Sequence, residues 1–531
     1  SGSGLGSLYL HQTLAEACEK AALSVAAACG KMRCVFGLPL LDDGRAYSAL
    51  ALAEGGVITR FALKRGLTDG QKAVFSPGYQ GTIGFDGRTL PCGTEGEMTI
   101  DAEGFDRVRA VFPDDLAEHL EKINGNGERT VYALPGLEPA IAGRMGLLAP
   151  ALAALLPRGA VLAYANAGAN ESTTDLVYAG DAAIMQDGRL LSTAAPFTGE
   201  VAAAEIHSGQ RQADNPPADS ESLPMDRDSR QPFAPIAGPR REAWCRDALE
   251  IAARGLAARM QRIGAQAATL GVSGGLDSAM ALLTTRRAFE ILGLPRAGIY
   301  GYSLPGLGSS ARTRGNALKL LEAMGLAPRE IDLKASILRH FEDIGQDPMV
   351  HDAAYENAQA RERTQVLMDL ANRLGGLMVG SGDLSELALG FTTFGGDHMS
   401  MYGVNAGLYK SAIRLIVRQC AADAGAGSLR DTLLDILDTP ISPELLPGQG
   451  GQIAQKTEDL LGPYELNDWM LHHFLEDRAS PRQMLEKAQA AFGNEYSRDE
   501  ILSRMRALFK RFFASQFKRN CMPDGPNVLG V

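Results

Sequence analysis

The run GVSGGLDSAM, residues 271–280, constrains the fold of this chain more than any other stretch. Residues 266–272 have the apolar character of a short buried strand, and Asp277 to Leu292 keep apolar residues at helical spacing. The motif therefore lies in the turn between a strand and a helix. Gly274 and Gly275 let the backbone approach a ligand closely, and the first amides of the helix point outward. The sequence predicts a loop that binds a pyrophosphate group.

The polar side chains of the motif extend this prediction. The hydroxyls of Ser273 and Ser278 add hydrogen-bond donors. A carboxylate at Asp277 repels phosphates unless a divalent cation lies between them, since a helix start offsets only about 1 kcal/mol. We therefore expect a magnesium ligand at Asp277. The alternative is that Ser273 or Asp277 caps the helix and the glycines make a tight turn. The motif is not a Walker A loop, because it has no GxxxxGK[ST] pattern.

SGGxDS is the signature of the ATP pyrophosphatases, which split ATP into AMP and pyrophosphate while they activate an oxygen of the second substrate. Four later segments resemble NAD synthetase in its long, glutamine-dependent form. These segments are residues 355–372, 380–402, 445–468 and 517–526. The resemblance covers almost the whole chain, in order, and it implies that ATP and deamido-NAD are the substrates and Mg²⁺ the cofactor.

The length of the chain and three strand-like runs predict the domain organisation. A chain of 531 residues with 45% hydrophobic residues normally makes two or more domains. Strand-like runs at 266–272, 297–303 and 376–380 alternate with helical patterns, and a polar loop follows each of them. We expect an α/β fold whose C-terminal part is a doubly wound parallel sheet with the ligand at the carboxyl edge.

The resemblance assigns the remaining parts of the chain. Residues 1–206 resemble a nitrilase-like α/β sandwich, which we expect to be incomplete. The stretch 208–241 is rich in proline, serine and charge, which is typical of a linker. The predicted division is an amidase-like domain at 1–206, a linker at 207–241 and a synthetase domain at 242–531.

Charge, cysteine content and hydropathy exclude several classes of partner. A net charge of -11 and a pI near 5.4 argue against nucleic acid, which weakens the tRNA-thiolating branch of the superfamily. The seven cysteines form no CxxC pattern, so we expect neither a zinc site nor a disulfide framework, and we expect a reducing cytoplasm. No apolar run reaches about 18 residues, so no membrane partner is expected. The chain begins at Ser1, which leaves a tag residue or a trimmed start open.

Within the resemblance, the ATP site combines the glycine-rich motif with two later residues. Ser381 stands where the family usually has threonine, and Lys410 in LYKS matches a lysine that approaches the phosphates, although the family pattern is usually PKT. By resemblance, Glu386 shares the magnesium ion or the substrate with Asp277. The predicted ATP contacts are Gly271, Val272, Ser273, Gly274, Gly275, Leu276, Asp277, Ser278, Ser381 and Lys410.

The deamido-NAD site is predicted in the same way. Asn357 and Arg361 are four residues apart on one helix, where the alternative is a solvated, ion-paired surface. The ring of Phe391 is placed to stack on a pyridine, and core packing is its alternative. The prediction for Lys518 rests on the resemblance alone, since a lysine in a C-terminal tail is ordinarily solvated. The predicted contacts are Asn357, Arg361, Glu386, Phe391, Thr392, Thr393, Phe394 and Lys518.

The N-terminal amidase resemblance lacks parts of its catalytic centre. Such domains use a glutamate base, a lysine and a cysteine nucleophile. Lys64 falls at the lysine, but the best match for the nucleophile segment puts Pro113 at the cysteine, and the glutamate is expected before the start of this chain. The segment around Cys92 resembles a different part of the family, so we expect Cys92 to be a bystander.

The sequence therefore predicts an NAD synthetase with an inactive glutaminase half. In the implied reaction, deamido-NAD is adenylated by ATP and ammonia displaces AMP. The resemblance also suggests a homo-oligomer. Three alternatives stay open: glutamine as nitrogen donor, with the missing residues supplied from outside this chain; another ATP pyrophosphatase such as GMP synthetase; and a catalytically silent scaffold.

Overall fold

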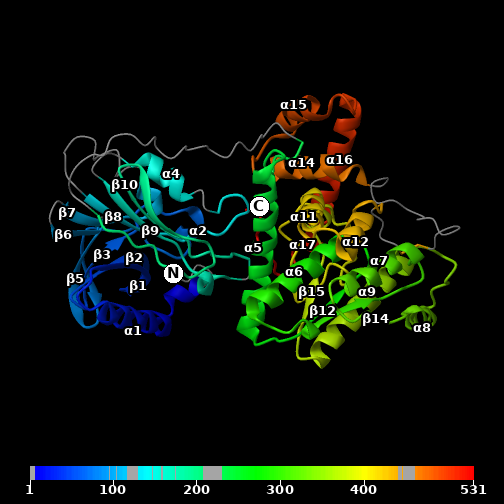
Figure 1. Cartoon of the computed structure of the whole chain (residues 1–531), viewed down its shortest axis with the longest axis horizontal. Helices are drawn as coiled ribbons and strands as arrows, with labels where there is room; N and C mark the ends of the chain where they lie inside the picture. The colour runs from blue at the N-terminus through cyan, green and yellow to red at the C-terminus, as the bar shows by residue number, and fades with distance from the viewer. Residues whose placement is uncertain are drawn as a thin grey trace. The chain divides into compact units, whose positions relative to one another are not determined.

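The computed structural model folds into two compact units (Figure 1). The first unit comprises Ser1–Ala140, Arg144–Thr173 and Tyr178–Ser222, and the second comprises Ile141–Gly143, Thr174–Val177 and Leu223–Val531. The structure describes residues 6–94, 96–102, 105–116, 130–145, 148–156, 160–173, 175–206, 230–440, 445–446 and 461–530. Residues 207–229 of the predicted linker lie outside the described residues, so the predicted domain boundaries stay a prediction.

The first unit contains two sheets with a helix on the outside of each. One sheet has the order β1-β2-β3-β5-β4, and the other has the order β11-β10-β9-β8-β7-β6. The elements are η1 (Gly6–Leu10), α1 (Gln12–Cys29), β1 (Cys34–Asp42), β2 (Arg45–Glu54), β3 (Val57–Leu63), α2 (Asp69–Lys72), β4 (Gly81–Phe85), β5 (Arg88–Gly93), β6 (Gly96–Ala102), β7 (Phe105–Ala110), η2 (Pro113–Asp115), β8 (Thr130–Pro135), α4 (Leu148–Leu155), β9 (Val161–Ala165), η3 (Ala169–Glu171), β10 (Ala182–Gln186) and β11 (Arg189–Ala194).

Strand β2 shows why these layers form. Its successive side chains point to opposite faces, and both faces are apolar. Ala49 and Ala51 pack in the cluster that includes Ala22 and Ala26 of α1. Leu50 and Leu52 instead pack with residues of the other sheet, including Phe112 after β7. A strand buried on both sides requires a helix on one side and a sheet on the other, so the unit is a helix–sheet–sheet–helix sandwich.

The second unit is built on one parallel sheet with the order β14-β13-β12-β15-β16. The strand order reverses between β12 and β15, which is where open α/β sheets bind ligands. The elements are α5 (Pro239–Ile263), β12 (Ala268–Gly271), α6 (Leu276–Leu292), η4 (Arg296–Gly298), β13 (Ile299–Ser303), α7 (Ala311–Ala323), β14 (Arg329–Glu330), α8 (Lys334–Ile344), α9 (Ala353–Arg373), β15 (Leu377–Gly380), α10 (Leu384–Leu389), β16 (Tyr402–Gly403), α11 (Lys410–Asp423), α12 (Ser428–Leu437), α14 (Tyr464–Leu475), α15 (Pro481–Phe492), α16 (Arg498–Ala514) and α17 (Gln516–Arg519).

Helices cover both faces of this parallel sheet. Tyr302 of β13 packs in a cluster with Phe341 of α8 and Tyr355 of α9. The neighbouring Gly301 faces the other way, because a Cβ there would lie 2.4 Å from a side-chain atom of Leu321 in α7. Adjacent strand residues thus contact different helix layers, as in a doubly wound fold. The predicted fold class is confirmed for both units, and the predicted strands correspond to β12, β13 and β15.

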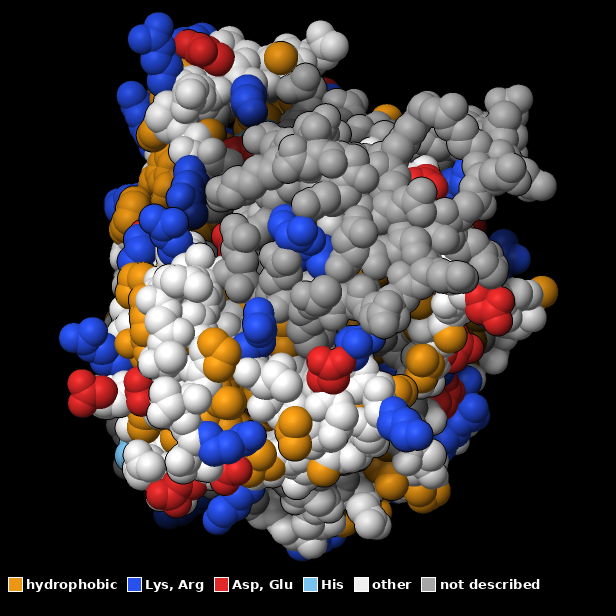
Figure 2. Space-filling view, turned by 90° about the vertical axis from the view of Figure 1, so that its left-hand side faces the viewer, with side chains coloured by type: hydrophobic (Ala, Val, Ile, Leu, Met, Phe, Trp, Pro, Cys, Tyr) orange, Lys and Arg blue, Asp and Glu red, His pale blue; other side chains and the backbone are white. Residues whose placement is uncertain are grey.

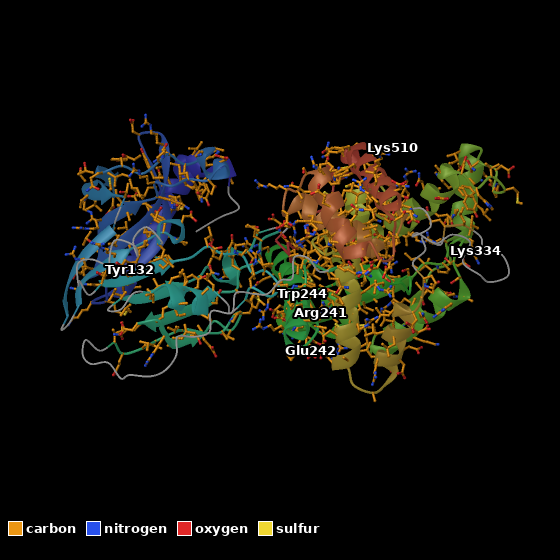
Figure 3. All side chains as sticks on the ribbon, turned by 90° about the horizontal axis from the view of Figure 1, so that it is seen from above. Tyr132, Arg241, Glu242, Trp244, Lys334 and Lys510 are labelled. Carbon is orange, nitrogen blue, oxygen red and sulfur yellow. A yellow bond between two sulfur atoms is a disulfide. The ribbon has the colours of Figure 1, made fainter. Side chains whose placement is uncertain are left out.

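Each unit buries large aromatic side chains of its own. Tyr132 of β8 is fully buried in the first unit, and Trp244 of α5 is buried in the second (Figure 3). On the face shown in Figure 2, the described Lys and Arg side chains are interspersed with Asp and Glu. Within the described parts of the chain, no helix is long and apolar enough to cross a membrane.

One expectation about the cysteines is wrong. Cys29, the last residue of α1, is joined to Cys34, the first residue of β1, in a disulfide. The two residues are five apart and are brought together by the short turn between the helix and the strand. This local pairing does not follow a recognised cysteine spacing, which is why the sequence did not reveal it.

The layered core of the first unit makes a testable prediction. Replacing Leu52, which is fully buried between the sheets, by alanine removes apolar contacts and leaves a cavity, so we expect a loss of about 2–5 kcal/mol in free energy of unfolding. Val57→Ala, at a half-exposed position of β3, is the control and should change stability by less than about 0.5 kcal/mol. Denaturant unfolding of both variants measures the difference, and equal losses would contradict the sandwich.

Candidate active site

The loop between β12 and α6 has the backbone of an anion-binding turn. Gly274 has φ = 80°, and a Cβ at this position would lie 2.0 Å from the carbonyl oxygen of Thr313. Only glycine fits there. Gly275 is the N-cap of α6 and has no side-chain acceptor for the first amides of the helix. These amides are therefore directed to a ligand or to solvent.

The two serines of the motif fold this loop. The Ser273 amide donates to the Ser278 hydroxyl at 3.2 Å, and that hydroxyl donates to the carbonyl oxygen of Gly275 at 3.0 Å. The Gly275 amide donates to the Ser273 hydroxyl at 3.2 Å. The serine side chains thus brace the turn from inside. Their predicted contacts with ATP stay a prediction.

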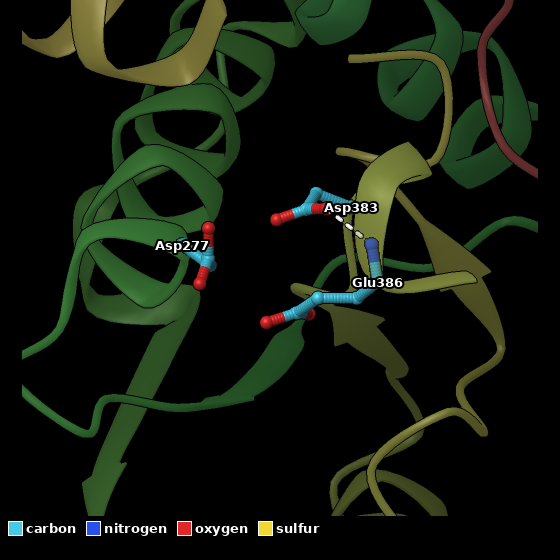
Figure 4. A group of neighbouring side chains, drawn as sticks. All are labelled: Asp277, Asp383 and Glu386. Carbon is cyan, nitrogen blue, oxygen red and sulfur yellow. Dashed lines mark hydrogen bonds between the residues drawn. The ribbon is translucent and has the colours of Figure 1, made fainter. Parts of the chain in front are cut away.

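A second polar loop follows β15 and lies beside the first. Asp383 caps α10 by accepting the amide of Glu386 at 2.9 Å, as Figure 4 shows. Asn405 connects the two loops. Its side-chain amide donates to the carbonyl oxygen of Asp277 at 3.0 Å and to that of Ser381 at 2.9 Å. Asn405 is fully buried, and the sequence reasoning missed it. Its signal was a single asparagine in the apolar run YGVNAGLY.

Three carboxylates converge where these loops meet. One oxygen each of Asp277, Asp383 and Glu386 lies within 4.8 Å of the others (Figure 4). Burial raises the pKa of Glu386 to about 7 and that of Asp383 well above its ordinary value. Within the described structure, Oδ1 of Asp277 is buried without a hydrogen-bond partner. A cation would satisfy such a group of oxygens, so the set is suited to hold a magnesium ion.

The ammonium group of Lys410 lies among these carboxylates. Its Nζ is 2.6 Å from Asp277 Oδ2, 2.6 Å from Asp383 Oδ2 and 2.8 Å from Glu386 Oε1. Burial alone would lower the pKa of Lys410, but the three carboxylates raise it well above the ordinary value. The sequence predicted that Lys410 approaches phosphates, and it missed Asp383. The only signal for Asp383 was its place three residues before Glu386 in SGDLSE.

The predicted dinucleotide contacts surround the segment that follows α10. Lys518 of α17 donates to the carbonyl oxygen of Gly390 at 2.8 Å and also to that of Thr392. Lys518 is therefore hydrogen-bonded to residues 390–394, which we call the dinucleotide segment because the resemblance assigned Phe391 to Phe394 to deamido-NAD. Phe517, next to it, packs against Phe394 with a ring-centroid distance of 5.6 Å.

Helix α9 approaches the same segment from the other side. The Thr393 hydroxyl donates to Asn357 Oδ1 at 2.8 Å, and Arg361 Nε donates to the carbonyl oxygen of Phe394 at 3.2 Å. The ring of Phe394 is 45% exposed and stacks on His398. Asn357 and Arg361 thus face this segment, so neither is a purely solvated position.

A cavity of about 290 Å³ extends from the glycine-rich loop and the carboxylates to Phe391 in the segment after α10. Its apolar walls include Leu304, Leu367 and Met378, and Arg363 adds a cation. Such a mixture of apolar walls and a few polar groups is typical of small-molecule sites. The predicted site residues that line it are Gly271, Val272, Ser273, Asp277, Ser278, Ser381, Glu386 and Phe391. The other predicted residues are not among its lining residues: Gly274, Gly275, Leu276, Lys410, Asn357, Arg361, Thr392, Thr393, Phe394 and Lys518.

In the first unit, the predicted amidase residues form a different arrangement. Lys64 is buried and makes an ion pair with Asp114, the neighbour of Pro113 in η2. Lys64 is thus close to Pro113, the residue that the sequence resemblance aligned with the nucleophile, and that alignment stays a prediction. Cys92 is buried in β5, and burial raises the pKa of its thiol. A protonated, enclosed thiol is a poor nucleophile.

Comparisons with known proteins agree with these features. The family model described as NAD synthase matches residues 249–520. The glutamine-dependent NAD(+) synthetase of Mycobacterium leprae is 30% identical over 99% of this chain and 87% of that protein. The proteins of the same name from Mycobacterium bovis and Mycobacterium tuberculosis are 34% identical, and these alignments cover 70% of this chain and 62% of those proteins.

Two solved structures share the fold. A glutamine-dependent NAD(+) synthetase from Cytophaga hutchinsonii has a TM-score of 0.75 at 17% identity, over 99% of this chain and 87% of that chain. The enzyme of Acinetobacter baumannii has a TM-score of 0.63 at 16% identity, over 96% of this chain and 86% of that chain. The chain therefore belongs to the NAD synthase family, whose enzymes are ligases that form a carbon–nitrogen bond.

Proposed function

We propose that this protein converts deamido-NAD to NAD⁺ with ATP and ammonia and releases AMP and pyrophosphate. The observation that carries the proposal is one cavity in the second unit. It is bounded by the glycine-rich loop, by the carboxylates of Asp277 and Glu386, and by Phe391 of the dinucleotide segment. Membership of the NAD synthase family supports the same reaction. Membership of this family also argues against the alternative of a GMP synthetase.

The proposed reaction has two steps. The nicotinate carboxylate attacks the α-phosphorus of ATP, and ammonia then attacks the acyl adenylate. A carboxylate is a poor acylating agent because oxide is a poor leaving group, whereas AMP leaves readily. The amides at the start of α6, which have no side-chain cap, would face the charge that develops on pyrophosphate. No protein nucleophile is needed, so the chain must mainly align the substrates and exclude water.

A magnesium ion fits the carboxylates of this site. Asp277 and Glu386 would hold it, because their oxygens belong to one cluster with Asp383 and because, among the described residues, Oδ1 of Asp277 has no hydrogen-bond partner. When bound, the ion would neutralise the phosphate charge. Lys410 already holds the three carboxylates together, which limits their mutual repulsion while the site is being formed.

We propose ammonia rather than glutamine as the nitrogen donor. Pro113 offers no nucleophile, Lys64 is neutralised by Asp114, and Cys92 is an enclosed thiol with a raised pKa. The similarity to glutamine-dependent NAD(+) synthetases favours the second candidate, glutamine, with the missing groups supplied by sequence outside this chain. We also propose that the protein forms a homo-oligomer and acts in the cytoplasm. The proposed domain boundaries lie at residues 206 and 241.

The nitrogen donor is tested by comparing ammonium with glutamine. We expect NAD⁺ formation with ATP, deamido-NAD and ammonium, and no rate above background with glutamine, because Pro113 replaces the nucleophile. Cys92→Ala and Lys64→Met should leave the ammonium-dependent rate within about twofold of wild type. Full activity with glutamine that Cys92→Ala abolishes would show that Cys92 is the nucleophile.

The metal site is tested by removing one carboxylate. Asp277→Asn keeps the size of the side chain but loses its charge, so we expect kcat/KM for Mg-ATP to fall by about 100-fold or more. Calorimetry should show weaker Mg-ATP binding, and chelation by EDTA should stop the reaction until Mg²⁺ is restored. The control is Asp343→Asn, an exposed carboxylate on α8. An active Asp277→Asn enzyme would exclude the site, and absence of Mg-ATP binding in wild type would favour the silent scaffold.

The anion-binding loop is tested at its tightest glycine. In Gly274→Ala the new Cβ meets the carbonyl oxygen of Thr313, so the loop must move, and we expect about 100-fold lower kcat/KM for ATP. Gly264→Ala is a matched control. Gly264 also has positive φ, at 69°, but a Cβ there has no described atom within 4 Å. Both variants share the strain of a left-handed alanine. If they lose equal activity, the close approach at Gly274 has no special role.

A further inference from the structure

A carboxylate outside the cavity connects the two helices that carry the site residues. Asp468 of α14 is fully buried. It accepts the hydroxyl of Ser385 in α10, and it accepts both the amide of Ser411, at 2.8 Å, and the hydroxyl of Ser411 in α11. The Lys410 amide in turn donates to the Ser385 hydroxyl at 3.0 Å, which completes a hydrogen-bond network between α10, α11 and α14.

Asp468 supplies a cap that helix α11 lacks in its own sequence. The N-cap residue of α11 is Tyr409, and among the described contacts its side chain makes no capping hydrogen bond. The amides of the first turn need acceptors, and a negative charge at a helix start is favourable. Asp468 provides both from another helix, since it binds the amide of Ser411 in the first turn. The direction of α11 at its start therefore depends on α14.

The same carboxylate fixes the start of α10. Ser385 lies between Asp383 and Glu386, two of the carboxylates that surround the Lys410 ammonium. One group thus connects the backbone that carries Lys410 to the turn that carries its partners. A shift of either helix would change the distances in the carboxylate cluster.

Keeping a carboxylate at this depth has a physical cost. Removing a charge from water is unfavourable unless hydrogen bonds compensate for it. Among the described residues, Asp468 receives such bonds from Ser385 and Ser411. An apolar residue would fill the same volume without this cost, so filling space does not account for a carboxylate at position 468.

We propose that Asp468 is a positioning residue of the active site, which holds Lys410 and Glu386 at the separation that Mg-ATP binding requires. It acts through Ser385 and Ser411 and touches no substrate, because it does not line the cavity. The inference rests on the proposed synthetase function. A cap with a purely structural role is the alternative, and it predicts lower stability with unchanged kinetics.

The test compares Asp468→Asn with a control just beyond the C-terminal end of the same helix, α14. Asparagine keeps the size but has one acceptor oxygen instead of two, so it cannot accept from both Ser385 and Ser411 as Asp468 does. We expect kcat/KM for ATP, with ammonium saturating, to fall by about 10- to 100-fold, and the Kd for Mg-ATP from calorimetry to rise. Asp477→Asn breaks the ion pair with His473, away from the cavity lining, and should lower Tm while keeping kinetics and Mg-ATP affinity within about twofold.

Asp468→Asn with lower Tm but wild-type kinetics and affinity would overturn the proposal. If Asp468→Asn does not fold, Ser411→Ala decides. It removes one donor to Asp468 and keeps a good helix former, and it should change KM and Kd several-fold in the same direction. Unchanged values in Ser411→Ala would also overturn the proposal. If wild type binds Mg-ATP but makes no NAD⁺, the synthetase proposal fails, and the comparison of Kd values still judges Asp468.

Discussion

The ion cluster around Lys410 is the interaction on which the second unit depends. A fully buried ammonium is unfavourable unless each of its donors meets an acceptor, and here three carboxylates provide them. Asp277 comes from the turn after β12, Asp383 and Glu386 from the turn after β15, and Lys410 from the start of α11. The chain cannot bury this lysine without bringing three distant segments together. Forming the cluster and forming the site are therefore one event.

The sheet makes this convergence possible. The strand order reverses between β12 and β15, and open α/β sheets have their ligand-binding crevice at such a point, outside the carboxyl ends of the strands. Asn405 crosses that crevice and donates to the carbonyl oxygens of Asp277 and Ser381. The side chain of Asn405 thus joins the two loops, while Asp277 and Glu386 line the cavity. The same polar network continues to Asp468 behind the site.

The sequence predicted the parts of the site that depend on local pattern. The glycine-rich turn, its strand and its helix follow from residues within 266–292, and the fold class follows from the repeated strand–loop–helix pattern. The roles of Asp383, Asn405 and Asp468 could not be read in this way. Asn405 meets Asp277 across 128 positions, and Asp468 meets Ser385 across 83. Strands β14 and β16 have two residues each, which is too short for a hydrophobic period.

The two units use a buried lysine in opposite ways. Lys410 has three carboxylate neighbours, and among the described residues Oδ1 of Asp277 is left without a hydrogen-bond partner, so the cluster still offers an oxygen to a second cation. Lys64 has Asp114 as its ion-pair partner, so one positive charge meets one negative charge. The carboxylate of Asp114 is 56% exposed, whereas the lysine is buried. Proline at 113 also fixes the backbone beside it and offers no polar side chain. The cost of leaving a buried charge unpaired is sufficient to explain the ion pair of Lys64, and catalysis is not required to explain it.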